Sequence, residues 1–413
     1  MLFLIGMITI HRSTFYLFNL RYHTRVVLQL SMRHYLPHSY KRKGIDWVSN
    51  SVVVRESLRL EEQLAIWEDV YLNTRCSSPF LSPHWIEGWL RNISSPLLTA
   101  LFYCGNHIKG IALIGTNTQR VLGLKINNAY LNQAGTETED QAWIEYNDLL
   151  CPEKFRTEFF ELLVSELRKR RFHRFKTSMK TNSYLQFSKS QYIAHTDVLI
   201  TKGFTTSLDV FTQYPSKIMS KNSRTQIKRS QKLLKLEFGD IDILKCSTPT
   251  EILEGLKELA ELHRLRWGST ENGSGFDNSI FMEHQKSILL TKPHFAELIK
   301  CVAGNKTIGF SINLILSETV FFYCSGINYF RNDNKVKAGY VMHHEIMNYY
   351  ANRGFKTYDF LGGNSRYKSS LSNREVSFFT ETFIFNNLTG KVLSTYKKIR
   401  HCLSKPSPDF PQQ

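Results

Sequence analysis

The sequence predicts an α/β fold with mixed sheets, arranged as two similar halves in tandem. Three observations favour this prediction: helical apolar spacing alternates with short strand-like runs, the same order of elements occurs in each half, and the halves share a turn sequence. The shared turn reads GNHIKGI at 105–111 and GNKTIGF at 304–310. Asn and Gly supply the backbone geometry of a tight turn between strands. Chance similarity between common turn sequences is the alternative to duplication.

The first half begins with two helices and continues with strands. Apolar side chains at helical spacing predict a helix over 58–72, and a second helix around Trp85–Leu90 follows the break at Ser77–Pro79. A later helix ends in Arg168–Arg171, where cations are stabilised by the helix dipole. In order, the remaining elements are strands at 98–104, 108–115 and 121–126, the helix at 156–170 and a strand around 172–175.

The second half repeats this order. Its predicted elements are helices at 251–267 and 278–290, strands at 298–303, 307–316 and 319–327, a helix at 339–352, and strands at 357–361 and 378–385. Gly354 caps the helix at 339–352, because glycine adopts the left-handed conformation that ends many helices. The predicted organisation is a leader at 1–50, a first domain at 51–205, a second domain at 206–400 and a tail at 401–413.

Residues 1–45 are basic and aromatic, without a clear period. The apolar start MLFLIGMITI is too short to span a bilayer, and no small-residue cleavage site follows it. A disordered leader, or translation from an upstream start codon, is the favoured interpretation. A peripheral membrane anchor is the alternative. We expect the segment to add little to folding or activity.

The composition favours an anionic partner. The 413 residues include 53 Lys and Arg against 36 Asp and Glu, a formal charge of +17, which suits nucleic acid, a phosphorylated cofactor or an anionic membrane face. The seven cysteines are scattered without a CxxC pair or a zinc-like Cys/His spacing. We therefore expect free thiols in the cytoplasm, no transmembrane segment and no metal ion. His343-His344-Glu345 departs from HExxH and is expected on a helix surface.

A basic helix is predicted between the halves, at about 215–236. Its cations are spaced three or four residues apart, which places them on one helical face. They are Lys217, Lys221, Arg224, Lys228, Lys232 and Lys235. A solvated surface helix is the plainer interpretation, and a phosphate-binding stripe is the functional one.

The start of the helix at 339–352 gives the best local signal for an anion site. The strand at 320–326 leads through RNDNKVKAG at 331–339 into this helix, and a helix N-terminus offers free N–H groups and partial positive charge. Gly339 lets the backbone approach an anion closely. Lys335 and Lys337 add positive charge.

The sequence GFKTYDFLGG at 354–363, followed by Tyr367-Lys368, resembles the C-terminal GNAT-type domain of the CelD-like, FemAB-related N-acyltransferases. The resemblance covers about residues 55–400, and the order of its motifs carries it more than any single motif. The other similar segments are SPFLSPHW at 78–85, EYN at 145–147, the basic helix, HRLRW at 263–267 and KAG at 337–339. The resemblance implies two tandem GNAT-like domains and acyl transfer to an amine.

The resemblance also implies a cofactor site. In the wider GNAT superfamily, the helix start after the fourth strand holds the pyrophosphate of acyl-coenzyme A. That role falls here on Lys337, Ala338, Gly339 and Tyr340, flanked by Lys335. This chain has one glycine where the superfamily loop often has two or more, and Lys337-Ala338 replaces a commoner Ser-Pro. The first half has LLCPE at 149–153 instead, so its cofactor site is predicted to be degenerate.

Two residues are candidates for catalysis. FemAB relatives use an aromatic–Lys pair in the second domain for aminoacyl transfer, and Tyr367-Lys368 lies in a comparable place. An ammonium group near the attacked carbonyl would stabilise the developing oxyanion. A surface lysine or a partner of Asp359 is the alternative for Lys368. Glu145 is a candidate general base for the attacking amine, with a structural hydrogen bond or a surface position as its alternative.

These observations predict a GNAT-type N-acyltransferase that moves an acyl group other than aminoacyl, with acetyl favoured, from acyl-coenzyme A directly to an amine. The acceptor would be a small molecule or a precursor in cell-envelope or polysaccharide metabolism. A FemAB-like transferase that uses aminoacyl-tRNA is the second interpretation, so tRNA is a less favoured partner. A non-catalytic protein that binds polyanions through the basic helix is the third.

Overall fold

The computed structural model describes residues 49–56, 58–270, 273–330 and 335–403, without the side chains of 398–403. Ser49–Gln413 groups as one compact unit. The predicted leader and most of the predicted tail lie outside the described residues, so the expectation that the leader is dispensable stays a prediction.

The described residues form helices and strands in the alternating order that the sequence predicts. The helices are α2 (Leu60–Leu72), α3 (Pro83–Leu90), α4 (Glu153–Lys169), α5 (Leu208–Gln213), α6 (Pro215–Ile218), α7 (Lys221–Phe238), α8 (Pro249–Trp267), α9 (Ser279–Thr291), α10 (Ala338–Asn352), α11 (Arg366–Ser370) and α12 (Leu388–Leu403). The strands are β1 (Ser51–Arg55), β2 (Leu98–Cys104), β3 (His107–Val121), β4 (Leu124–Leu131), β5 (Arg174–Lys180), β6 (Ile193–Ser207), β7 (Ile241–Cys246), β8 (Ala296–Ala303), β9 (Lys306–Leu316), β10 (Thr319–Ile327), β11 (Thr357–Gly362) and β12 (Arg374–Phe385).

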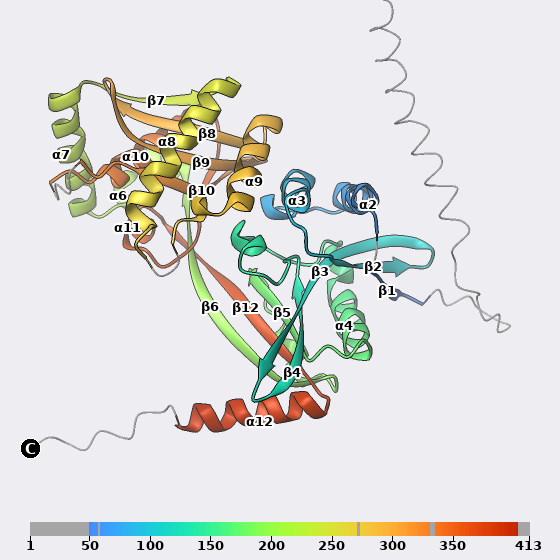
Figure 1. Ribbon diagram of the computed structural model, residues 1–413. Coiled ribbons are helices and arrows are strands. Elements are labelled where there is room, and N and C mark those ends of the chain that lie inside the picture. The colour runs from blue at the N-terminus through green and yellow to red at the C-terminus, as the bar shows by residue number, and fades with distance from the viewer. Residues whose placement is uncertain (1–48, 57, 271–272, 331–334, 404–413) are drawn as a thin grey trace, which may run out of the picture. The chain divides into compact units, whose positions relative to one another are not determined.

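One mixed sheet of twelve strands runs through the molecule in the order β1-β2-β3-β4-β5-β12-β6-β11-β10-β9-β8-β7 (Figure 1). From the first edge, β1 to β4 pair antiparallel and β5 joins β4 in parallel. From the other edge, β7 to β10 pair antiparallel and β11 joins β10 in parallel. The mixed α/β fold and the equivalence of the two predicted strand meanders are therefore confirmed.

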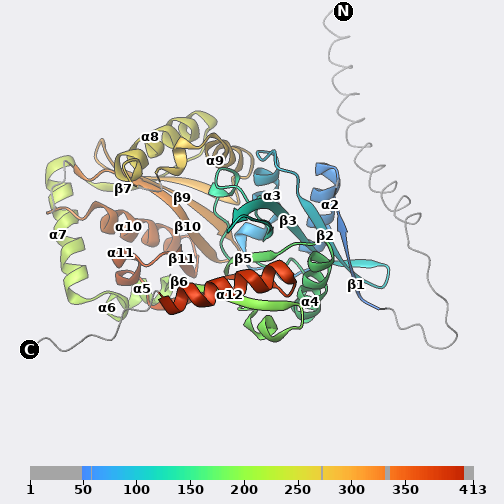
Figure 2. The same cartoon turned by 60° about the horizontal axis from the view of Figure 1, so that its bottom comes forward.

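The two halves exchange their last strands. β12, near the end of the chain, pairs with β5 of the first half, while β6 pairs with β11 of the second half. β6 and β12 also pair with each other, from Arg374↔Thr205 to Phe385↔Ile193, and cross the centre of the sheet side by side (Figures 1 and 2). The expectation of two separate sheets is wrong for this reason, since the exchanged strands join the two halves into one sheet.

Helices cover both faces of this sheet. α2 and α3 share an apolar core with α8 and α9, so the two halves bury apolar surface against each other. α10, with α5 and α7, packs over a second core, and α4 packs over a third core in the first half. Figure 2 shows α8 and α10 on opposite sides of the second-half strands.

The basic helix at 215–236 is not continuous. α6 ends at Ile218, Met219 is extended with φ −105° and ψ 136°, and α7 begins at Lys221. The Ser220 hydroxyl accepts a hydrogen bond from the Ser223 N–H and so caps the new helix. The cation of Lys217 therefore belongs to a different helix from the other five.

Two further expectations are corrected. The strand predicted at 121–126 is split by a turn at Leu122 and Gly123, whose φ angles are 51° and 77°, and this turn joins β3 to β4. His343 is 1% exposed, not a surface residue, because it lies on the face of α10 that packs against the sheet. β1, β6, β7, α5, α11 and α12 were not predicted.

Candidate functional site

The candidate site forms where β11 ends, at Gly362. Glu145 Oε2 accepts a hydrogen bond of 2.6 Å from the Gly362 N–H. Lys368 Nζ donates a hydrogen bond of 2.6 Å to the Gly362 carbonyl. Both predicted catalytic residues, 223 positions apart in the sequence, thus bind the backbone of the same residue, Gly362.

Local structure holds both side chains in place. Glu145 lies in a loop pinned by Asn147, whose N–H donates to the Met179 carbonyl and whose side-chain amide donates to the Leu131 carbonyl. Lys368 lies on α11, directly after β11. The acid therefore comes from the first half of the chain and the amine from the second, and the strand exchange brings them together.

A buried tyrosine–carboxylate pair lies beneath this contact. The Tyr146 hydroxyl donates to Asp359 Oδ2, and Asp359 Oδ1 accepts 2.7 Å from the Leu361 N–H. Asp359 is 3% exposed. Because Tyr146 follows Glu145 in the loop, this hydrogen bond fixes the loop against β11. Asp359 is therefore bonded to Tyr146 and the backbone, while Lys368 bonds to Gly362.

Burial shifts the ionisation of the three charged groups. It raises the pKa of Glu145 to about 7, against the lowering effects of the Gly362 N–H and of Lys368. It raises the pKa of Asp359 to about 6, against the Tyr146 hydrogen bond. Burial lowers the pKa of Lys368, and the charges of Glu145 and Asp359 oppose that shift. A carboxylate with a pKa near neutrality can accept and release protons at physiological pH.

The contact requires glycine at its centre. A Cβ at Gly362 would lie 2.5 Å from Met179 Cε and 3.1 Å from Glu145 Oε2. The next residue, Gly363, has φ +117° and donates its N–H to the Lys202 carbonyl of β6. The paired glycines of the predicted motif therefore let the acid and the amine come close to the backbone at the end of β11.

The two parallel strands next to the site diverge. β10 and β11 pair only over Thr319–Phe321 and Thr357–Asp359, and β10 is irregular between Phe322 and Cys324. The buried hydroxyl of Tyr323 has no hydrogen-bond partner among the described residues. Burial is the main cause that raises the pKa of that hydroxyl, and Cys324 and Glu145 add to the shift. Beyond these three residue pairs, β10 and β11 are not paired with each other.

The start of α10 lies in the same region. The Tyr340 hydroxyl contacts Ser370 of α11 at 3.4 Å, and His343 stacks on Tyr367 with ring centroids 5.1 Å apart. α10 therefore packs along the short helix that carries Lys368. Burial lowers the pKa of His343 to about 3, so this imidazole is neutral.

The first turn of α10 suits an anion. It contains no acidic residue. Within the described part of the chain, the backbone N–H groups of Ala338, Gly339 and Tyr340 have no hydrogen-bond partner, while the Lys337 N–H donates to Ser230 of α7. Lys335 is exposed and Lys337 is partly exposed. Unpaired N–H groups and the helix dipole favour a phosphate here.

In the first half, the equivalent helix is α4, and charged side chains of the protein itself lie at its start. α4 begins with Glu153 after Pro152. Arg156 pairs with Asp148 at 3.2 Å and also with Glu153. Two carboxylates near this helix start would repel a phosphate, which agrees with the predicted degenerate site.

The basic face of α7 lies beside α10. Four of its predicted lysines are exposed, Lys221, Lys228, Lys232 and Lys235, and Lys217 of the neighbouring α6 is exposed as well. Lys235 pairs with Asp240, and Arg224 donates to the Met219 carbonyl. The structure thus places the stripe near the candidate anion site but does not join it to Glu145 or Lys368.

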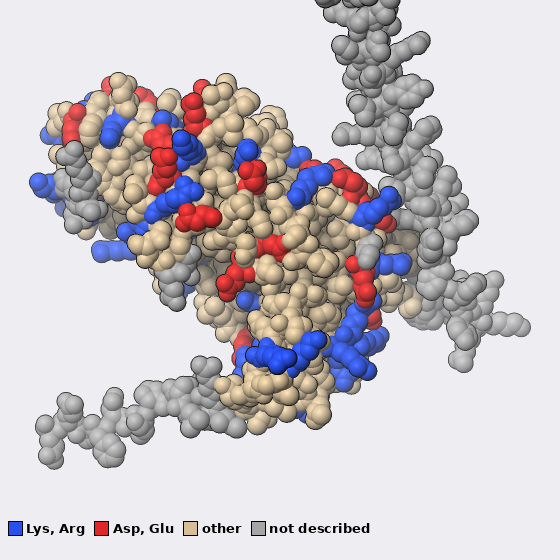
Figure 3. All heavy atoms as spheres, viewed as in Figure 1, with Lys and Arg blue, Asp and Glu red and all other residues tan. Residues whose placement is uncertain are grey.

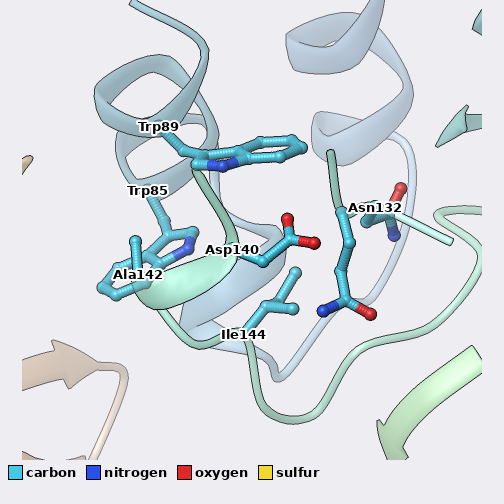
Figure 4. A pocket seen from close by; sticks show the side chains of 7 residues that line it. Trp85, Trp89, Asn132, Asp140, Ala142 and Ile144 are labelled. Atoms are coloured by element: carbon cyan, nitrogen blue, oxygen red, sulfur yellow. The ribbon is translucent and has the colours of Figure 1, made fainter. Parts of the chain in front are cut away.

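Two hollows lie away from this site. A cavity of about 10 Å³ lies between α3 and the chain around Asp140 and is lined by Trp85, Trp89 and Asn132 (Figure 4). It is large enough for one water molecule only. A hollow of about 330 Å³ lies beside Lys109, Lys154 and Phe155 in the first half. Neither includes Glu145 or Lys368.

No three metal-binding side chains come together in the described part of the chain. Within that part, no helix has the length and apolarity needed to cross a bilayer.

Sequence reasoning missed Tyr146 and the role of Gly362. Tyr146 lies in the EYN segment that carries Glu145, and Gly362 lies in the quoted GFKTYDFLGG motif. The motifs identified the two segments as similar to the family. The hydrogen bond between Tyr146 and Asp359 joins residues 213 positions apart, so no local sequence pattern indicates it.

Comparisons with known proteins agree with this geometry. Residues 221–369 match the family described as an acetyltransferase (GNAT) domain. A solved structure of FemX is 13% identical, with a TM-score of 0.50 over 83% of this chain and 100% of that chain. The C-terminal domain of a putative lysylphosphatidylglycerol synthetase from Agrobacterium fabrum is 9% identical, with a TM-score of 0.49 over 82% and 96% of the two chains. A tandem GNAT protein from the clavulanic acid biosynthesis pathway is 11% identical, with a TM-score of 0.43 over 81% and 98%.

No curated protein matches the chain. At 13% identity, the similarity to FemX shows a shared fold. The GNAT family match lies in the second half, and the first half repeats the strand pattern of the second. The second half therefore contains a GNAT domain, and the repeated strand pattern gives the first half a similar fold.

Proposed function

We propose that this protein is an N-acyltransferase that moves an acyl group, with acetyl favoured, from acyl-coenzyme A to an amine. One observation carries the proposal: Glu145 and Lys368 meet at Gly362, beside diverging strands and a helix start whose N–H groups have no partner among the described residues. The predicted cofactor residues fit an anionic donor, since the first turn of α10 has no carboxylate and, within the described residues, N–H groups without a partner. Ala338, Gly339 and Tyr340 would hold its phosphates.

Glu145 would act as the base. A bound acyl thioester supplies an activated carbonyl carbon. The acceptor nitrogen forms a bond to that carbon, the bond to sulfur breaks, and the amine proton passes to Glu145. Glu145 Oε2 is held by the Gly362 N–H, while Oε1 has no hydrogen bond among the described residues and is the oxygen available for the proton.

Lys368 would stabilise negative charge on the attacked oxygen. Its ammonium group donates to the Gly362 carbonyl, and a second N–H could reach an oxyanion at the end of β11. Because the Lys368 side chain is largely buried, its charge acts through a medium of low dielectric. In this proposal, Glu145 accepts the amine proton and Lys368 stabilises the oxyanion, and both groups are positioned by the backbone of Gly362.

The pH dependence of turnover tests the role of Glu145. Only the deprotonated carboxylate accepts a proton, so turnover should fall as the pH drops through about 7, the raised pKa of this group. Glu145→Gln should lower the maximal rate by at least about tenfold and remove this acid limb. The measurement is kcat from pH 5 to 9 at saturating acetyl-coenzyme A with a panel of amines.

The matched control is Glu375→Gln on β12, where the carboxylate is exposed and pairs with Lys202 at 3.0 Å. It should retain both the rate and the acid limb. An unchanged acid limb in Glu145→Gln would remove Glu145 from the proposal.

Binding of acetyl-coenzyme A tests the anion site. Gly339→Asp adds a negative charge at the second residue of α10, and among the described residues a Cβ there meets only Ile327 Cδ1, at 3.2 Å. Loss of one charge-assisted hydrogen bond, at about 1.5–3 kcal/mol, should weaken binding by roughly one to two orders of magnitude. Isothermal titration calorimetry measures the affinity.

Two control variants separate the effect of the added charge from the effects of side-chain size and of position in the chain. Gly339→Ala adds bulk without charge and should change the affinity much less. Lys154→Asp makes a similar change at the second residue of α4, where the side chain is exposed, and should leave the affinity unchanged. Equal losses from Gly339→Asp and Lys154→Asp would contradict a second-half cofactor site.

A FemAB-like transferase that uses aminoacyl-tRNA is the second candidate. The fold shared with FemX and the exposed lysines of α7 favour it. Lys228→Glu with Lys232→Glu should weaken tRNA binding if this candidate is correct, and should leave acetyl-coenzyme A binding unaffected. Aminoacyl transfer without any affinity for acetyl-coenzyme A would replace the first proposal with this one.

A further inference from the structure

A second basic surface, distinct from α7 and from the candidate site, lies at the far end of the first half. Three segments form it: the turn between β3 and β4, the C-terminal end of α4 with the loop after it, and the first turns of α12. We call it the basic–apolar end. We propose that the basic–apolar end binds the surface of a lipid bilayer that contains anionic phospholipids. This inference goes beyond acyl transfer and does not depend on it.

The three segments form one continuous surface. The Asn127 N–H donates to His173 Nδ1 at 2.9 Å, which joins β4 to the loop after α4. Arg168 donates to the Asn386 carbonyl, which joins α4 to the residues before α12. Beneath them, Val121 of the turn packs against the small core of Ile126, Ile384 and Leu393.

Cations dominate the basic–apolar end. The exposed ones are Arg120, Lys125, Arg168, Lys169, Arg171 and Lys391. Over 118–127, 166–174 and 384–393, the sole acidic residue is Glu166, and its carboxylate is already paired with Arg170 and Lys169. Figure 3 shows Lys and Arg atoms gathered on the lower part of the molecule, where α4 and β4 lie in Figure 1.

Exposed aliphatic side chains lie among these cations. Leu122 and Leu124 at the turn are 58% and 36% exposed, and Leu388 and Val392 on α12 are 83% and 43% exposed. Leu388 and Val392 are one helical turn apart and so lie on one face of α12. The opposite face is fixed to the protein, because Leu393 is buried at 1%.

This combination favours a lipid surface over a nucleic acid. Cations attract anionic head groups, and aliphatic side chains enter the boundary between head groups and acyl chains. Nucleic-acid surfaces offer phosphates and stacked bases, which pair with cations and with aromatic side chains. The exposed apolar residues here are aliphatic, and they lie at a turn and at a helix start, where they can enter a bilayer without unfolding the chain.

Vesicle co-sedimentation of the full chain tests the proposal. The probes are vesicles of phosphatidylcholine alone and vesicles of phosphatidylcholine mixed with phosphatidylglycerol. We expect binding to the mixed vesicles that weakens with added salt, and little binding to phosphatidylcholine alone. Equal binding to both kinds of vesicle, or binding to neither, would overturn the proposal.

Two variants separate the charged and apolar contributions. Arg120→Glu with Lys125→Glu should weaken binding to mixed vesicles by about 25-fold, at roughly fivefold for each cation. Leu122→Asn with Leu388→Ser should weaken it by about tenfold. Asn tolerates the positive φ of 51° at position 122. All four side chains are exposed, so the folded state should persist, and the far-ultraviolet circular dichroism spectrum checks this.

A matched control and a competing ligand complete the test. Lys228→Glu with Lys232→Glu makes the same charge change on α7 and should leave vesicle binding unaltered. The leucine variant should bind bulk tRNA as well as the unmodified protein does. Should tRNA binding depend on the leucines, or vesicle binding not depend on them, the basic–apolar end is not a lipid-binding surface.

Discussion

Lys180→Met is expected to lower the free energy of unfolding by about 3–5 kcal/mol, the usual cost of removing one partner of a buried ion pair. Lys180 Nζ lies 2.6 Å from Glu381 Oε2, and both side chains are 0% exposed. The pair joins β5 of the first half to the exchanged strand β12. Met fills a similar volume but leaves the carboxylate without its cation. Urea denaturation measures the change.

Glu381 would keep only neutral partners in this variant. It accepts hydrogen bonds from the Ser183 hydroxyl and the Tyr184 N–H, which do not replace a full charge. The Lys180 ammonium also lies 3.4 Å from the centre of the Tyr184 ring, and this cation–π contact is lost as well. Lys180→Met with Glu381→Gln should recover part of the loss, because no unpaired charge is then buried.

Lys202→Met is the matched control for Lys180→Met. Lys202 also pairs with a glutamate of β12, Glu375 at 3.0 Å, but the two side chains are 52% and 47% exposed. Exposed pairs contribute about 0–1 kcal/mol. Similar losses from Lys180→Met and Lys202→Met would show that burial of the Lys180 pair has no special role in holding the exchanged strand.

Most of the strands that sequence analysis predicted have local signals. β8 and β9 flank the turn at Gly304, and β8 to β10 each pair with the next strand along the chain. β6 was missed, and its partners β11 and β12 come more than 140 positions later. Leu199 and Ile200 of β6 are also exposed at 63% and 59%, so the strand lacks the apolar pattern of a core strand.

The candidate site could be predicted only in its parts. Residue type and the family resemblance identified Glu145 and Lys368 as candidates. Neither of these two kinds of evidence indicates that both side chains bind the same glycine. That contact depends on the loop at Tyr146, which has φ 47°, and on the exchange of strands. The helix start at Gly339 was predicted within one residue, because α10 begins at Ala338 and a helix N-terminus has local signals.

Lys368→Met is expected to lower turnover by about 10²–10³-fold, the usual loss when one donor to a developing oxyanion is removed. The affinity for acetyl-coenzyme A should stay near that of the unmodified protein, because the phosphates are proposed to bind the backbone N–H groups at the start of α10 and not the ammonium group. The measurements are kcat and the calorimetric dissociation constant on the same preparation. A loss confined to kcat indicates an interaction made in the transition state.

A merely structural Lys368 would give a different pattern. Its hydrogen bond to the Gly362 carbonyl holds the end of β11, so a structural role predicts lower unfolding stability with kcat unchanged in the folded fraction. Arg366→Met, at an exposed position of the same helix, should change neither quantity and controls for the loss of a cation from α11. Lys368→Arg keeps the charge and should restore part of the turnover if charge on the oxyanion is what matters. Because the ammonium and Glu145 bind the same glycine but come from different halves of the chain, a loss of turnover that Lys368→Arg partly restores would assign the two halves separate chemical functions, with the base in the first and the oxyanion donor in the second.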